Sequence, residues 1–155
     1  MSLSLTDIKI AFHTKSCEDV NVKIDRLDHS IHEITKALLD ETKSSAGDKY
    51  ETGREMIKQE IDKLEAQLII ARKELQTLTQ INPSRLCQSA ELGALVTVTG
   101  PMSYFISISG HKIDTNEGAI VSIAPMSPIG QAMLGCKTGE TFKFGGKPFL
   151  IQSII

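Results

Sequence analysis

The chain has 155 residues, of which 41% are hydrophobic and 23% are charged, a composition typical of one or two soluble globular domains. Its formal net charge of −2 argues against strong, independent binding to nucleic acid, which needs clustered lysine and arginine. Three widely spaced cysteines exclude a disulfide framework and a zinc knuckle, and the sequence shows neither a signal-peptide core nor an apolar run of about 18 residues. We therefore expect a cytoplasmic protein without a membrane segment.

Residues 1–16 have the least regular pattern. Thr6 and Asp7 are candidates to cap a helix, so the first helix could begin this early. From about residue 18 to residue 43 the helical pattern is clear. His29 and His32 lie one helical turn apart on it, away from the apolar seam and without neighbouring carboxylates, so we expect them to be exposed to solvent rather than to bind a metal.

Apolar residues on the two sides of residues 40–55 follow mirror-image patterns with alternating steps of three and four. The first series is Cys17, Val20, Ile24, Leu27, Ile31, Ile34 and Leu38, and the second is Ile57, Ile61, Leu64, Leu68, Ala71, Leu75 and Leu78. A repeat that averages about 3.5 residues is the signal of a coiled coil. Folding the chain back between Gly47 and Asp48 opposes the two series, which predicts an intramolecular antiparallel hairpin. The alternative is two amphipathic helices that pack on something else, including a second copy of the chain.

The sequence changes character after Asn82 and Pro83, which end the second helix because the residue before a proline disfavours helical geometry. Short alternating runs predict strands at residues 94–99, 104–109, 119–124, 141–144 and 149–154. Ser127 and Pro128 are placed to cap and begin a short helix that ends before Gly135. We therefore predict an α+β protein: an antiparallel α-helical coiled-coil hairpin at residues 1–81 with an acidic tip at about 40–55, and a domain at 82–155 with an antiparallel sheet and one short helix.

Two motifs resemble those of the bacterial Gre transcript-cleavage factors, a family of transcription elongation factors. The first is Gly47-Asp48-x-x-Glu51-x-x-x-Glu55 at the predicted tip, and the second is the run from Ser127 to Gly135 followed by Gly139-Glu140. The order of the domains and the length of the hairpin also agree, so the resemblance covers about residues 17–155. It implies that residues 82–155 have an FKBP-like fold and dock on RNA polymerase.

The resemblance also implies a function. The hairpin would enter the secondary channel of RNA polymerase, where Asp48 and Glu51, and more weakly Glu55, would act in the polymerase active site near the 3′ end of backtracked nascent RNA. Asp48 and Glu51 would share a Mg²⁺ ion with the polymerase, since carboxylate oxygens suit this ion. The chain would then be a monomer that has no cofactor of its own and is not an enzyme, but stimulates the cleavage activity of RNA polymerase.

The docking residues implied by the resemblance are Asp114, Ser127 and Pro128, which match the edge of the family's second domain that faces the polymerase. The residues themselves leave simpler roles open. Ser127 is equally expected to cap a helix, and Asp114 is equally expected to occupy a turn.

Alternatives also remain for the tip. The spacing of Asp48 and Glu51 is that of a capping box, in which each side chain bonds the backbone of the other residue. Lys49 and Gly53 depart from the family pattern, because a cation among the carboxylates weakens metal attraction and a glycine loosens the first helical turn. A second hypothesis is therefore a secondary-channel regulator that does not stimulate cleavage. A third is an FKBP-like prolyl isomerase or chaperone module on a coiled-coil stalk.

Overall fold

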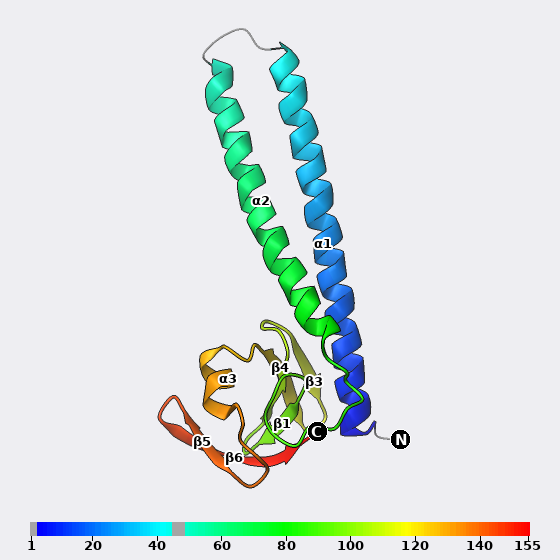
Figure 1. Cartoon of the computed structure of the whole chain (residues 1–155), viewed down its shortest axis with the longest axis vertical. Coiled ribbons are helices and arrows are strands. Elements are labelled where there is room, and N and C mark those ends of the chain that lie inside the picture. Colours follow the sequence, from blue (N-terminus) through cyan, green and yellow to red (C-terminus); the bar gives the residue numbers. More distant parts are fainter. Residues whose placement is uncertain (1–2, 45–48) are drawn as a thin grey trace. The chain divides into compact units, whose positions relative to one another are not determined.

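The computed structural model describes residues 3–44 and 49–155 (Figure 1). The chain divides into two compact units. One is Glu18–Leu75, and the other combines Met1–Cys17 with Gln76–Ile155. No helix within the described residues is both long enough and apolar enough to cross a membrane.

Two long helices form the predicted hairpin: α1 spans Leu5–Ser44 and α2 spans Lys49–Thr79 (Figure 1). Within Glu18–Leu75, three buried residues of the seam and three half-buried neighbours pack together: Leu27, Leu68, Ala71, Ile24, Ile31 and Leu64. These six residues make up three of the pairs that the mirror-image pattern opposes. Packing between two helices of the same chain is therefore confirmed, and an exposed ion pair from Arg72 Nη2 to Asp28 Oδ1 at 3.5 Å also joins them.

The start of α1 differs from the expectation in its capping residue. The Asp7 N–H donates to Ser4 Oγ at 3.1 Å, and the Ser4 N–H donates to Asp7 Oδ2 at 3.2 Å. These reciprocal bonds form a capping box, which satisfies backbone donors that have no partner inside the helix. Ser4, rather than Thr6 or Asp7, is therefore the N-cap. His29 and His32 are exposed on α1, as expected.

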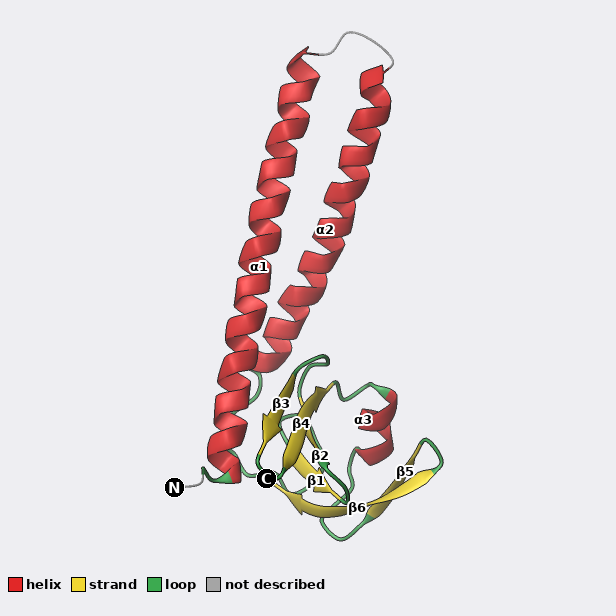
Figure 2. Ribbon diagram, turned by 180° about the vertical axis from the view of Figure 1, so that it is seen from behind, coloured by secondary structure: helices red, strands yellow, loops and turns green. Residues whose placement is uncertain are grey.

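Six strands form a sheet in the order β3-β4-β2-β1-β6-β5 (Figure 2). Their bounds are β1 Leu95–Val98, β2 Met102–Ile106, β3 Lys112–Thr115, β4 Gly118–Ile123, β5 Thr141–Phe144 and β6 Lys147–Ile154. β2 and β4 pair in parallel, and the other neighbours pair antiparallel. With the short helix α3, Pro128–Met133, the predicted α+β class is confirmed, and β3 is a strand that the sequence pattern did not predict.

The main core lies on one face of the sheet. Its buried residues are Cys87, Ala90, Ala94, Val96, Val98, Ile106, Ile123, Met133, Phe142 and Ile151. Met133 brings α3 onto this core, and α3 packs beside β5. Because side chains alternate along a strand, Leu95 points to the opposite face from Val96. On that side, Phe12 of α1 meets Phe105 of β2 edge-on, with ring centroids 5.5 Å apart.

The parallel pairing of β2 and β4 depends on a close backbone approach at Gly118. This residue has φ +139°, and an added Cβ would lie 2.2 Å from the Pro101 carbonyl oxygen. The next residue, Ala119, donates its N–H to the same oxygen at 2.9 Å. The connection into β4 therefore requires a glycine at position 118.

Candidate functional site

The predicted acidic tip lies mostly outside what the structure describes. Asp48 falls outside the described residues, and the side chain of Glu51, in the first turn of α2, also lies outside them. Glu55 is described and is exposed on α2. The predicted roles of Asp48 and Glu51 at a shared Mg²⁺ ion, and of Glu55 beside them, therefore stay predictions.

Asp114 is an exposed residue of β3, the strand at one end of the sheet order. It pairs with Ala119 of β4, so it lies in a strand and not in a turn. Its side chain is 83% exposed and forms an ion pair with Lys112, with 3.5 Å between Nζ and Oδ1. Exposed ion pairs of this kind contribute little to stability, so the carboxylate can exchange this neighbour for one on a partner.

Ser127 is the N-cap of α3, as its sequence context predicted. Its Oγ accepts a hydrogen bond from the Gly130 N–H at 3.2 Å and donates one to the Ala124 carbonyl oxygen at 2.6 Å. Pro128 follows at the start of the helix and is exposed. The capping role of Ser127 is confirmed, whereas its role in docking stays a prediction.

The three predicted docking residues do not form one local cluster. Asp114 belongs to β3 at one end of the sheet order, whereas α3, which begins at Pro128, packs beside β5 at the other end (Figure 2). A partner that contacts all three would have to reach two separate elements.

An open groove of about 880 Å³, which was not predicted from the sequence, lies in the unit that contains Asp114. Leu95 and Ile120 of the sheet line the groove together with Ile8 and Leu5 of α1. Asp114 of β3, an edge strand of the sheet, also lines it. The signal that could have found this groove is the strand alternation, which places Leu95 on the face away from the main core.

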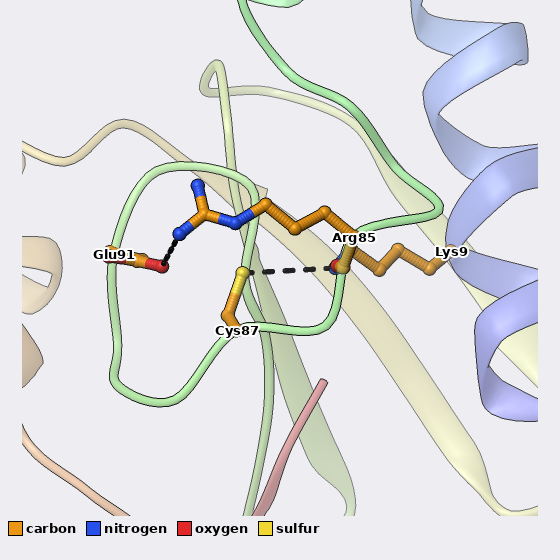
Figure 3. A network of polar contacts seen from close by, with 4 residues as sticks. All are labelled: Lys9, Arg85, Cys87 and Glu91. Atoms are coloured by element: carbon orange, nitrogen blue, oxygen red, sulfur yellow. Dashed lines mark hydrogen bonds and ion pairs between the residues drawn. The ribbon is translucent and has the colours of Figure 1, made fainter.

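A polar network, buried at Lys9 and Cys87 and exposed at Arg85 and Glu91, joins the first turns of α1 to residues 85–91 (Figure 3). Lys9 is 1% exposed, and its Nζ donates to the Arg85 carbonyl oxygen at 2.9 Å. The same Nζ lies 4.0 Å from Cys87 Sγ. The Arg85 guanidinium in turn contacts Glu91, with 3.4 Å between Nη2 and Oε1. This network was not predicted, because Lys9 and Arg85 lie 76 residues apart in the sequence.

Burial shifts the pKa values of Lys9 and Cys87, the two titrating groups at the centre of this network. Loss of solvation lowers the pKa of Lys9 from its usual 10.5, while the nearby Cys87 opposes the shift. Loss of solvation also raises the pKa of the Cys87 thiol from 9.0, while the nearby Lys9 opposes that shift. Both shifts disfavour the charged forms, the ammonium of Lys9 and the thiolate of Cys87.

Among the described residues, no group of three or more His, Cys, Asp or Glu side chains is placed to hold a metal ion. His13 instead uses Nε2 to contact the Leu78 carbonyl oxygen at 2.8 Å, close to the end of α2. Cys17 lies one helical turn later, with Sγ 3.9 Å from the same nitrogen. This histidine ties the first turns of α1 to the end of α2.

Comparisons with protein-family models and with curated protein sequences find no match to this chain. Several solved structures are similar to it, including the following two. The crystal structure of the GreA factor homolog 1 (Gfh1) protein of Thermus thermophilus has 21% sequence identity and a TM-score of 0.36, and the match covers 90% of this chain and 94% of that chain. A structure of the transcription factor Gfh1 has 23% identity and a TM-score of 0.35, with 90% of this chain and 92% of that chain covered.

Proposed function

We propose that the chain is a transcription elongation factor that binds RNA polymerase, places its hairpin tip in the secondary channel and stimulates Mg²⁺-dependent cleavage of backtracked RNA. One observation carries this proposal: the acidic motif of residues 47–55 occupies the connection and first turns between two long helices whose seam closes within one chain. Thirty helical residues extend roughly 45 Å, enough to carry a tip into a deep channel.

The chemistry assigned to the tip follows from its side chains. Asp48 and Glu51 supply the hard oxygen ligands that Mg²⁺ prefers, and Glu55 adds negative charge one turn later. Phosphoryl chemistry with two metal ions uses such ligands to hold the second ion and to orient the attacking water. The polymerase supplies the other metal ligands and the RNA, so the chain itself is not the enzyme.

A cleavage assay tests this function. Purified protein and Mg²⁺ are added to stalled, backtracked polymerase complexes with labelled RNA, and shorter RNA is the expected product. The double variant Asp48→Ala/Glu51→Ala is expected to bind polymerase but to leave the RNA intact. Glu60→Ala, an exposed residue farther along α2, is the matched control and is expected to cleave like the wild type.

Lys49 and Gly53 favour a second candidate function, a channel-binding regulator without cleavage activity. A lysine between the carboxylates opposes metal binding, and a glycine loosens the turn that presents them. In the same assay this candidate predicts that the wild type binds and inhibits the polymerase while the RNA keeps its length. That result would contradict the cleavage function but would still support binding to RNA polymerase.

Docking itself has a separate test. Asp114→Lys reverses an exposed charge and is expected to weaken binding to polymerase without changing the fold. Lys143→Glu, an exposed charge reversal of the opposite sign on β5, tests whether reversing any surface charge of this unit weakens binding. Equal binding by wild type and Asp114→Lys would remove Asp114 from the docking surface.

No structural observation favours the prolyl isomerase alternative. Such an enzyme needs aromatic side chains around an open pocket, but Phe105 and Phe142 are buried. Phe142 also stacks on Phe149, with ring centroids 5.4 Å apart. These rings are therefore engaged in the interior of the unit.

A further inference from the structure

The network in Figure 3 places an amine beside a thiol inside the protein. Lys9 is 1% exposed and Cys87 is 6% exposed, and 4.0 Å separates Nζ from Sγ. Both residues belong to the same compact unit. The lysine side chain has four methylene groups, so Nζ can reach the sulfur by rotating about its own bonds.

Two charged side chains, Arg85 and Glu91, lie next to the pair. Arg85 accepts the Lys9 hydrogen bond through its carbonyl oxygen, while its guanidinium contacts Glu91. Glu91 also lies close enough to Cys87 to accept a hydrogen bond from its thiol. Because burial lowers the pKa of Lys9, the neutral amine, which is the nucleophilic form, is formed at a lower pH than in an exposed lysine.

We infer that Lys9 and Cys87 form a modification site, at which oxidation by hydrogen peroxide joins Nζ and Sγ in a covalent sulfur–nitrogen bond. This inference is independent of the proposed function in transcription. Sulfenic acids condense with nearby nitrogen atoms to give sulfenamides, which is the chemistry required here.

The reaction has two steps. The Cys87 sulfur first attacks one oxygen of hydrogen peroxide, the O–O bond breaks, and a sulfenic acid and one water form. The lone pair of the neutral Lys9 amine then attacks the sulfur, the S–O bond breaks, and the departing hydroxide takes one amine proton to leave as a second water. Sulfur loses two electrons to the peroxide, and the protein loses two hydrogen atoms.

Proximity decides which product forms. Burial raises the pKa of the Cys87 thiol, so the first step is slow at neutral pH and speeds up as the thiolate fraction grows. Once the sulfenic acid exists, the amine is already in contact, whereas a second peroxide molecule must enter from solvent. Held reactants have a large effective concentration, so the amine captures the sulfur before further oxidation.

Mass spectrometry of tryptic peptides tests the inference. The reduced full-length chain is treated with increasing hydrogen peroxide, free thiols are alkylated after denaturation, and the chain is digested with trypsin. The expected product links the Cys87 peptide, residues 86–112, to a peptide that contains Lys9. Its mass is expected to lie about 2 Da below the sum of the two peptides, with cleavage after Lys9 lost and dithiothreitol restoring both peptides.

Two variants and one internal comparison sharpen the result. Cys87→Ser removes the sulfur, and Lys9→Arg keeps a long side chain with hydrogen-bond donors but removes the nucleophilic amine, so both are expected to lose the linked peptide. Cys136, whose thiol lies near the Glu140 carboxylate, is expected to oxidise without a link to lysine. Circular dichroism checks that each variant is folded, and the wild-type peptide map alone decides the question if one is not.

Three outcomes would overturn the inference. Cys87 could be recovered as sulfinic or sulfonic acid without the linked peptide. It could stay unmodified at a peroxide concentration that oxidises Cys136 completely. The linked pair could also carry an additional oxygen atom, which would exclude the direct sulfur–nitrogen bond.

Discussion

At the scale of single residues, Lys9 is the least expected feature of the protein. A lysine is rarely buried completely, because removing its charge from water is costly unless a partner compensates. Here the side chain ends against a carbonyl oxygen and a sulfur atom, and Glu91 is engaged by Arg85. The burial of this amine therefore makes the stability of the protein depend on pH.

The stability of the protein is expected to rise with pH through the titration of Lys9. Its pKa is lowered in the folded state, so between that lowered value and 10.5 the unfolded chain binds more protons than the folded one. The free energy of unfolding then increases with pH across this window. Denaturant unfolding of wild type and Lys9→Met between about pH 7 and 10 measures the effect, since methionine cannot titrate.

The difference in free energy of unfolding, wild type minus Lys9→Met, is expected to grow more favourable to the wild type as pH rises. Cys87 acts in the opposite sense above pH 9.0, because its raised pKa lets the folded state keep a proton that the unfolded chain has lost. The variant retains this thiol but removes the effect of Lys9 on its pKa, so the comparison isolates the lysine below pH 9.0. A difference that stays constant with pH would mean that the Lys9 amine is solvated.

Residues with local partners were predictable, and residues with distant partners were not. Ser127 was assigned a capping role because its acceptor and donor partners, Ala124 and Gly130, lie three residues away. Lys9 looks like any other lysine in a helical pattern, and only the folded chain brings Arg85 to it. The docking role of Asp114 rests on resemblance, since an exposed carboxylate has no contact that identifies its partner.

At the scale of elements, the hairpin is the part that the sequence predicted best. Its apolar period is repeated over several heptads, and each half independently gives the same seam. The cluster around Leu27 and Leu68 confirms that the two halves meet.

Truncating the hairpin seam is expected to destabilise the protein much more than truncating the outer face. Leu27→Ala removes a buried side chain, 7% exposed, and is expected to lower the free energy of unfolding by about 2–3 kcal/mol. Leu39→Ala is the matched control, because Leu39 lies on the same helix but is 58% exposed, and its effect is expected to stay below about 0.5 kcal/mol. Equal losses in urea unfolding would contradict packing across this seam.

The sheet was less predictable than the hairpin. β3 has only four residues, Lys112–Thr115, and three of them are polar, so it lacks the apolar alternation that indicates a strand. β3 is held as a strand by its antiparallel backbone pairing with β4. The parallel pairing of β2 with β4 also escaped prediction, because it depends on the backbone approach at Gly118 and Pro101 rather than on side-chain pattern.

At the scale of the whole molecule, the compact units do not follow the chain in order. The predicted division fell between residues 81 and 82, whereas the contacts group Met1–Cys17 with Gln76–Ile155. Two contacts account for this grouping: the Phe12 ring packs against the Phe105 ring, and Lys9 donates a hydrogen bond to the Arg85 carbonyl oxygen. A helical pattern indicates which face of α1 is apolar, but it does not indicate what covers that face.

Hydrogen exchange in low denaturant is expected to separate the two parts of α1. Contiguous packing units open together, so amides of residues 8–17 should exchange with those of β1 and β2. Amides of residues 24–31 should exchange with those of residues 64–71 in a separate opening. Mass-spectrometric exchange on peptides from each region measures this, and one common opening for all of α1 would contradict the division.

The discontinuous unit has a consequence for the protein while it is being made. The first turns of α1 emerge from the ribosome before their partners. Lys9 can bond only after Arg85 has been made, and Phe12 can pack only after Phe105 has been made. β1 likewise pairs with β6, the last strand of the sequence. The hairpin core can close earlier, because its partners all fall within Glu18–Leu75. Residues 5–17 therefore stay without these partners until the later part of the chain has been translated, and the unit that contains them is completed last.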